Sequence, residues 1–176
     1  MSIEPDVFIQ STVNRAAQTL SSNLTKNERI EQLQNIALET VDIEGISLYS
    51  LGQYRKTISD EQLSRYKDVF KKYFLISFSS RLAEYTNPEI EVQGKKILNK
   101  NYTIVNSLLI GTSDRPEVKI DWRIYTKNPD NPLIRDLIIE GLSLARTQKE
   151  EFSSILNTND GDINALFKTL EEFSNN

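Results

Sequence analysis

The sequence predicts an α+β protein in which N-terminal helices and a long helix pack on a curved antiparallel sheet of about four strands, with further helices at the C-terminus. Three observations lead to this prediction. Apolar residues recur every three or four positions as far as Tyr85, which is the period of a helix. Beyond Asn87-Pro88 they occur in short runs and in alternation, as in strands. The helical period returns from Leu144 to Phe173.

Two amphipathic helices are predicted at the start of the chain. The first runs from Val7 to Leu20 and the second from Glu28 to about Val41, because apolar side chains recur on one face of each. Gly45 and Gly52 bracket a short apolar segment that we also expect to be helical. These segments predict a helical layer that precedes the sheet.

A long helix follows, and the sequence marks its start and its end. Ser59 and Gln62 have the spacing of a capping box, in which each side chain bonds to the backbone N–H of the other residue. Asn87-Pro88 stops the helix, which is therefore predicted to end near Tyr85. One face carries a wide stripe of large side chains: Leu63, Tyr66, Phe70, Phe74, Phe78 and Leu82.

Four strands separated by turn residues are predicted after the long helix. They cover residues 91–98, 102–110, 118–124 and 133–139. The second is apolar at both parities, as expected of a strand that is covered on both faces. The third alternates between apolar and charged side chains, which predicts one buried face and one solvated face. Two helices, beginning near Leu144 and Ile163, complete the chain.

The length of 176 residues and the hydrophobic content of 38% fit one domain with a sizeable core. No repeat or long linker divides the chain. We expect a single domain over residues 1–176, composed of a helical part, a sheet and terminal helices at about 6–87, 89–140 and 143–174.

Composition excludes several classes of function. The net charge is −4, and basic residues form only doublets such as Lys71-Lys72 and Lys95-Lys96, so we expect no nucleic-acid partner. The chain has no cysteine and no histidine, which removes thiolate nucleophiles, His-based triads and the usual zinc ligands. No apolar run approaches the roughly 20 residues that span a bilayer. Residues 1–6 show no signal peptide.

The acidic residues Asp136 and Glu140 have two interpretations. Four positions apart on one strand, they would share a face and could serve as an acid–base pair. We favour a structural role, with Gly141 allowing a sharp turn and Ser143 capping the next helix. Residues 160–171 fit a calcium loop poorly, and Asp160 or Asp162 is better explained as a helix cap. We therefore expect no catalytic residue and no metal site.

Two short motifs occur in a characteristic order along the chain. Leu51-Gly52-Gln53-Tyr54 is followed some eighty residues later by Asp136-Leu137-Ile138-Ile139-Glu140-Gly141-Leu142-Ser143-Leu144. With the aromatic stripe between them, they resemble the MlaC family of periplasmic phospholipid-binding proteins, also called the toluene-tolerance auxiliary family. The resemblance extends from about Val7 to Phe173. The sheet with its long helix also resembles the cone-like fold of nuclear-transport-factor-like domains.

The resemblance implies a lipid carrier and not an enzyme, with no cofactor. It implies a monomer in the periplasm, with a signal peptide already removed, that shuttles phospholipid and so maintains the lipid asymmetry of the outer membrane. The implied partners are phospholipid, an inner-membrane ABC transporter with its substrate-binding component, and an outer-membrane lipoprotein complex. The family usually carries an aromatic pair ahead of the Asp, whereas this chain has Pro132 and Arg135 there.

The aromatic stripe also has two interpretations, because periodicity cannot tell a filled core from a hollow one. The resemblance favours an apolar cavity between the long helix and the sheet. The residues expected to bind lipid there are Leu48, Leu51, Phe70, Phe74, Phe78, Val105, Leu109, Ile120, Trp122, Ile124, Leu137 and Ile139.

Three other functions stay open. One is a small-molecule isomerase or dehydratase on the same cone-shaped fold, with Asp136 or Asp121 as base and Tyr125 or Tyr54 as electrophile. Another is a carrier of a different amphiphile, such as a hopanoid. The third is a protein-interaction module with a filled interior.

Overall fold

The computed structural model describes residues 2–176, and it confirms the predicted α+β class. Met1 lies outside the described residues, and the removal of a signal peptide stays a prediction. Along the chain the elements are α1 (Pro5–Ser21), α2 (Lys26–Thr40), α3 (Ile43–Leu51), the 3-10 helix η1 (Gly52–Lys56), α4 (Asp60–Leu82), β1 (Ile90–Ile97), β2 (Tyr102–Leu109), β3 (Val118–Tyr125), β4 (Leu133–Ile139), β5 (Leu142–Ser143), α5 (Leu144–Thr158) and α6 (Ile163–Ser174).

The strands form one antiparallel sheet in sequence order, β1-β2-β3-β4-β5. Side chains on β3 alternate as predicted, with Ile120, Trp122 and Ile124 buried on one face. Burial on β2 alternates too: Val105 is fully buried, whereas Ile104 is half-buried. The prediction that β2 is covered on both faces was therefore wrong, because helices cover only one face of the sheet.

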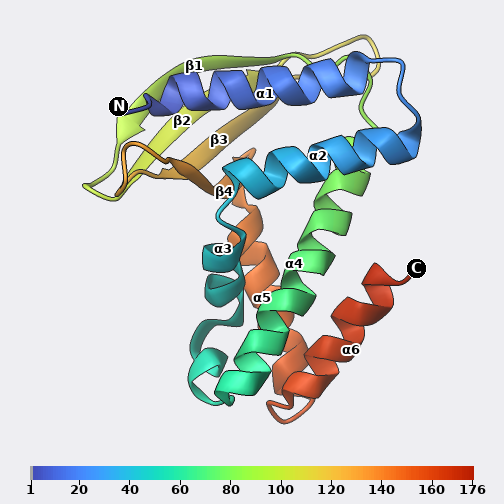
Figure 1. Cartoon of the computed structure of the whole chain (residues 1–176). Helices are drawn as coiled ribbons and strands as arrows, with labels where there is room; N and C mark the ends of the chain where they lie inside the picture. The colour runs from blue at the N-terminus through green and yellow to red at the C-terminus, as the bar shows by residue number, and fades with distance from the viewer. Residues whose placement is uncertain (1) are drawn as a thin grey trace.

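Helices α1 and α2 form an antiparallel pair over that face (Figure 1). Arg15 of α1 forms an ion pair with Glu39 of α2 at 2.9 Å, and the Thr19 hydroxyl donates to the Gln32 side chain at 3.2 Å. The N-terminus of α2 is fixed by a capping box in which Thr25 and Glu28 exchange hydrogen bonds.

Helix α1 also covers the edge strand β1. The side chain of Gln10 accepts a hydrogen bond from Val92 N–H at 3.2 Å and donates to Ile90 C=O at 3.4 Å, next to the register shift between Val92 and Gly94. A side-chain amide thus satisfies backbone groups that an edge strand would otherwise leave unpaired. This contact fixes α1 along the rim of the sheet.

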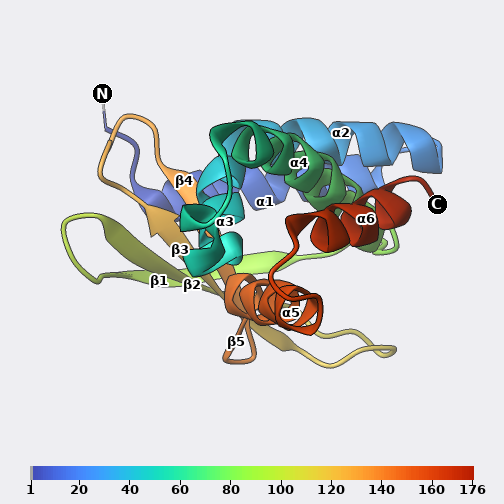
Figure 2. The same ribbon diagram turned by 90° about the horizontal axis from the view of Figure 1, so that it is seen from below.

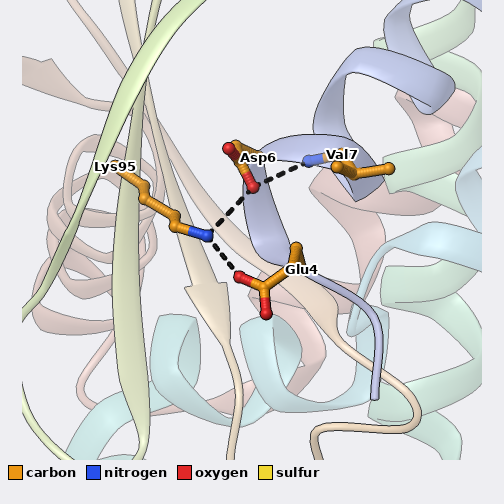
Figure 3. Close-up of polar contacts among 4 residues, drawn as sticks. All are labelled: Glu4, Asp6, Val7 and Lys95. Carbon is orange, nitrogen blue, oxygen red and sulfur yellow. Dashed lines mark hydrogen bonds and ion pairs between the residues drawn. The ribbon is translucent and has the colours of Figure 1, made fainter. Parts of the chain in front are cut away.

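A charged cluster adds to this attachment (Figure 3). Lys95 of β1 donates to the carboxylates of Glu4 and Asp6 at the start of α1, and these bonds raise the pKa of the Lys95 amine. Partial burial pushes the pKa of Asp6 upward, but the bonds from Lys95 and from Val7 N–H outweigh it and leave that pKa below its ordinary value. The cluster is exposed, so solvent screens these charges and limits their contribution to stability.

Helices α3, α4, α5 and α6 form a second helical body that projects from the sheet (Figures 1 and 2). Its core is aromatic. Tyr66 and Phe70 of α4 both meet the ring of Phe152 on α5 edge-on, with centroids 6.5 and 6.0 Å apart. The Tyr66 hydroxyl donates to Ser47 C=O of α3 at 2.7 Å, and burial raises the pKa of Tyr66.

Two polar junctions connect the helices to β4. At the first, Asp42 caps α3 by accepting from Gly45 N–H at 3.0 Å, and it accepts from Arg135 Nε at 2.6 Å. Arg135 also donates to the Tyr102 hydroxyl at 2.8 Å and lies over the ring of Tyr125. This junction holds the end of α2 and the start of α3 against the sheet.

At the second junction, Asp136 organises the start of α5. Its Oδ1 accepts from the backbone N–H of Leu137 at 2.8 Å and of Ala145 at 3.0 Å, and its Oδ2 accepts from the Ser143 hydroxyl. Ser143 in turn caps Arg146 N–H at 3.0 Å, as predicted.

Glu140 does not lie on the same strand face as Asp136, and this expectation was wrong. Glu140 and Gly141 both have positive φ, +50° and +83°, because they form the tight turn between β4 and β5. The Glu140 side chain accepts from Lys119 N–H at 2.6 Å instead.

We predict that Asp136→Asn lowers the free energy of unfolding by about 1 kcal/mol, because the amide retains one acceptor but loses the charge that strengthens these bonds. Urea denaturation followed by circular dichroism measures the change. Asp68→Asn, at an exposed position on α4, is the control and should be neutral. If the two variants lose the same stability, the cap does not contribute as described.

Candidate ligand cavity

An apolar cavity of about 160 Å³ lies between the α1–α2 pair, the end of α4 and the covered face of the sheet. Three helices and four strands contribute to its walls. From the helices and the segment after α4 come Thr12, Val13, Ala16, Ala17, Leu20, Leu33, Ile36, Ala37, Thr40, Val41, Phe78, Leu82, Tyr85 and Pro88. From the strands come Ile90, Leu109, Ile120, Trp122, Ile134, Leu137 and Ile139.

The polar groups of this lining are nearly all satisfied within the protein. The hydroxyls of Thr12 and Thr40 donate to backbone carbonyls one helical turn earlier, at 2.8 and 2.7 Å. Trp122 Nε1 donates to the Ser107 hydroxyl at 2.8 Å, and that hydroxyl donates to Ile120 C=O at 2.7 Å. The walls therefore present hydrocarbon to any occupant, since polar groups that are already paired offer little to a ligand.

Six of the twelve residues predicted from the sequence lie in this lining. They are Phe78, Leu109, Ile120, Trp122, Leu137 and Ile139. The other six lie elsewhere: Leu51, Phe70, Val105 and Ile124 are fully buried in the core, while Leu48 and Phe74 are half-buried on α3 and α4. A contact between any of the twelve and a ligand stays a prediction.

The aromatic stripe on α4 divides between two environments. Phe74 stacks between Phe70 and Phe78, with centroid distances of 6.0 and 5.6 Å. The stripe residues before Phe74 pack inside the helical body. After it, Phe78 and Leu82 line the cavity, together with Tyr85 from the segment that follows α4. The stripe is thus a filled core at one end and a cavity wall at the other.

The cavity wall formed by α1 and α2 was not predicted from the sequence. Small side chains dominate there: Thr12, Ala16, Ala17, Ala37 and Thr40. These small residues fall on the apolar faces of two amphipathic helices, a pattern that does not by itself distinguish a cavity wall from a packed core. Larger residues at these positions would close the space between the helices and the sheet.

The volume of about 160 Å³ is smaller than the roughly 300–1,000 Å³ of usual small-molecule sites. A large apolar ligand would therefore have to push the walls apart. Residues 2–176 contain no cluster of three or more acidic side chains that could hold a metal ion.

Comparisons with known proteins show the family and the fold of this chain. The model of the MlaC protein family matches residues 10–172, so the chain belongs to the MlaC family, as the sequence motifs predicted. A particular relative is the toluene tolerance protein ttg2D of Pseudomonas putida, which is 20% identical over 95% of this chain and 78% of its own length.

A solved structure has the same fold. It is the phospholipid-binding protein from Ralstonia solanacearum in complex with a phospholipid, with a TM-score of 0.81 and 17% identity. The match covers 98% of this chain and 97% of that one. Within residues 2–176, no helix combines the length and the apolar character needed to cross a membrane.

We predict that Trp122, the only tryptophan in the chain, reports on the contents of the cavity. Its side chain is 8% exposed and lines the wall, so its emission should be blue-shifted from that of tryptophan in water. Removing bound apolar molecules by organic extraction, followed by refolding, should shift the emission maximum. A water-like maximum both before and after extraction would contradict the placement of Trp122.

Proposed function

We propose that this protein is a periplasmic carrier that binds a phospholipid by its acyl chains and shuttles it between membrane complexes. The partners would be an inner-membrane ABC transporter with its substrate-binding component and an outer-membrane lipoprotein complex. The observation that carries the proposal is the apolar cavity, whose polar groups are bonded within the protein. Membership of the MlaC family supports it, as does the phospholipid bound in the Ralstonia solanacearum structure.

Energetics explain how such a carrier works without its own energy source. Burying two acyl chains of about 16 carbons is worth on the order of 25 kcal/mol, at about 0.8 kcal/mol per methylene. A bilayer offers the chains nearly the same stabilisation. A protein that encloses both chains can therefore exchange lipid with a membrane-bound partner at a small net change in free energy, so no nucleotide site is needed.

Loading a two-chain lipid requires the cavity to widen, because its volume is about 160 Å³. The walls belong to separate segments: α1 and α2 on one side, the sheet on the other. Contacts across the cavity are apolar, whereas the hydrogen bonds lie at its margins, at Gln10 and Asp42. Acyl chains that enter between the walls would replace protein–protein apolar contacts with protein–lipid ones.

The enzyme alternative finds little support in the positions of its candidate residues. Asp136 caps α5, and Asp121 accepts from Asn106 at 3.0 Å on the outer side of β3. The Tyr54 hydroxyl donates to Asn157, and Tyr125 packs against Tyr102. None of the four residues lines the cavity, so a substrate held there would meet none of them.

Filling the cavity tests the proposal. We predict that Ala17→Trp, which places a large ring in the space between α1 and the sheet, strongly reduces phospholipid that co-purifies with the protein. Organic extraction followed by mass spectrometry measures the bound lipid, and thermal unfolding checks that the variant is folded.

The control is Ala165→Trp on α6, outside the cavity, where lipid content should not change. Wild-type protein that yields no lipid, and that takes up none from phospholipid vesicles, would reject the carrier function. Recovery of a different amphiphile, such as a hopanoid, would support a carrier function with a ligand other than phospholipid.

A further inference from the structure

Arg115 lies at the rim of the cavity, and its side chain forms no hydrogen bond or ion pair with any of residues 2–176. It lies in the turn between β2 and β3, and its guanidinium sits 5.2 Å from the centre of the Tyr85 ring. Tyr85 lines the cavity and is 37% exposed, so its ring forms part of the rim. The guanidinium therefore lies where the apolar interior meets water.

The polar groups of this side chain are not satisfied by the protein. Among residues 2–176, the only buried side-chain nitrogen or oxygen atoms without a hydrogen-bond partner are Nε of Arg115 and Nε of Arg29. By contrast, Arg15, Arg65 and Arg135 all form ion pairs with carboxylates. A buried donor without a partner is destabilising, and a ligand that accepts from it would remove this penalty.

Both unpartnered arginines border the same end of the cavity. Arg29 lies one helical turn before Leu33, a wall residue, in the first part of α2. Lys26 of the same turn forms an ion pair with Glu84 at 3.1 Å, which brings the start of α2 next to Tyr85. The segments beside this end of the cavity therefore carry two arginines whose Nε atoms have no hydrogen-bond partner among residues 2–176.

The backbone holds Arg115 in place. Thr112 N–H donates to Arg115 C=O at 2.8 Å within the turn, and Ile110 N–H donates to Glu89 C=O at 2.9 Å, which joins the turn to the segment after Tyr85. The acidic neighbours Asp114 and Glu117 are exposed, and neither forms an ion pair with Arg115.

We propose that Arg115, placed on Tyr85, binds the phosphate of a phospholipid headgroup while the acyl chains occupy the cavity. A guanidinium offers a planar pair of N–H donors that matches two phosphate oxygens. The walls supply no headgroup recognition of their own, so this contact would distinguish lipids that carry a phosphate from neutral ones. The inference rests on the proposed carrier function and adds a headgroup subsite to it.

The test compares two ligands that differ in the phosphate. Delipidated protein is titrated with vesicles that contain either a fluorescent phosphatidylglycerol or a fluorescent diacylglycerol with the same chains. We expect Arg115→Gln to weaken phosphatidylglycerol binding about tenfold, and to leave diacylglycerol binding unchanged. Arg115→Lys, which keeps the charge but not the paired donors, should fall between the two.

Arg123→Gln is the matched control. Arg123 also stacks on a tyrosine, 4.3 Å from the centre of the Tyr102 ring, but it lies exposed on the uncovered face of β3. This variant should bind both ligands as the wild type does. Thermal unfolding of all variants confirms that each is folded.

Several outcomes would overturn the subsite. One is an Arg115→Gln protein that binds phosphatidylglycerol normally, and another is one that loses both ligands equally. A third is inorganic phosphate binding to the wild type as tightly as phosphatidylglycerol does, which would indicate a free anion site. Failure of the wild type to bind either lipid would instead reject the carrier function on which the subsite rests.

Discussion

The ion pair between Asp42 and Arg135 is the contact on which the arrangement of the cavity depends. It fixes the point where α2 ends and α3 begins against β4, and a backbone bond from Asp42 N–H to Ile134 C=O at 2.9 Å reinforces it. Both partners are largely buried, with side chains 19% and 26% exposed, so removing one would leave a poorly solvated charge. The helical wall of the cavity is thus connected to the sheet at the C-terminal end of α2. Helix α2 is about 22 Å long, and at its other end Lys26 forms an ion pair with Glu84 at 3.1 Å, next to Tyr85.

A cavity at this place is a consequence of side-chain size. Protein interiors normally pack to the density of organic crystals, and an unfilled apolar space forfeits dispersion contacts. Here the two helices that cover the sheet present alanine and threonine where larger residues would fill the gap. The helical body beyond Asp42 is packed differently, with Tyr66, Phe70 and Phe152 in mutual contact. The helical body is therefore filled by side chains, whereas a space remains between α1, α2 and the sheet.

Much of this fold could be predicted from the sequence, because hydrophobic periodicity and helix capping depend on residues that lie close together in the chain. The capping box at Ser59 and the bounds of β4 are as predicted. Which part of α4 meets the cavity could not be predicted, since a 23-residue helix about 35 Å long passes two different environments on one face. The partner of Arg135 is 93 residues away, and no local pattern connects the two. The alanines of α1 gave no distinct signal, because alanine is common on any helix.

Several motif residues have structural positions, whereas Leu137 and Ile139 of the second motif line the cavity. Gly52 ends α3 with a φ of +58°, and Asp136 with Ser143 starts α5. In the proposed carrier, selection of the ligand would come from the size of the cavity and from its rim. The polar groups of the lining are nearly all bonded to the protein, so the walls would respond only to the bulk of an acyl chain. Discrimination between headgroups would then depend on charged side chains where the cavity meets water, such as Arg115, whose Nε has no hydrogen-bond partner among residues 2–176.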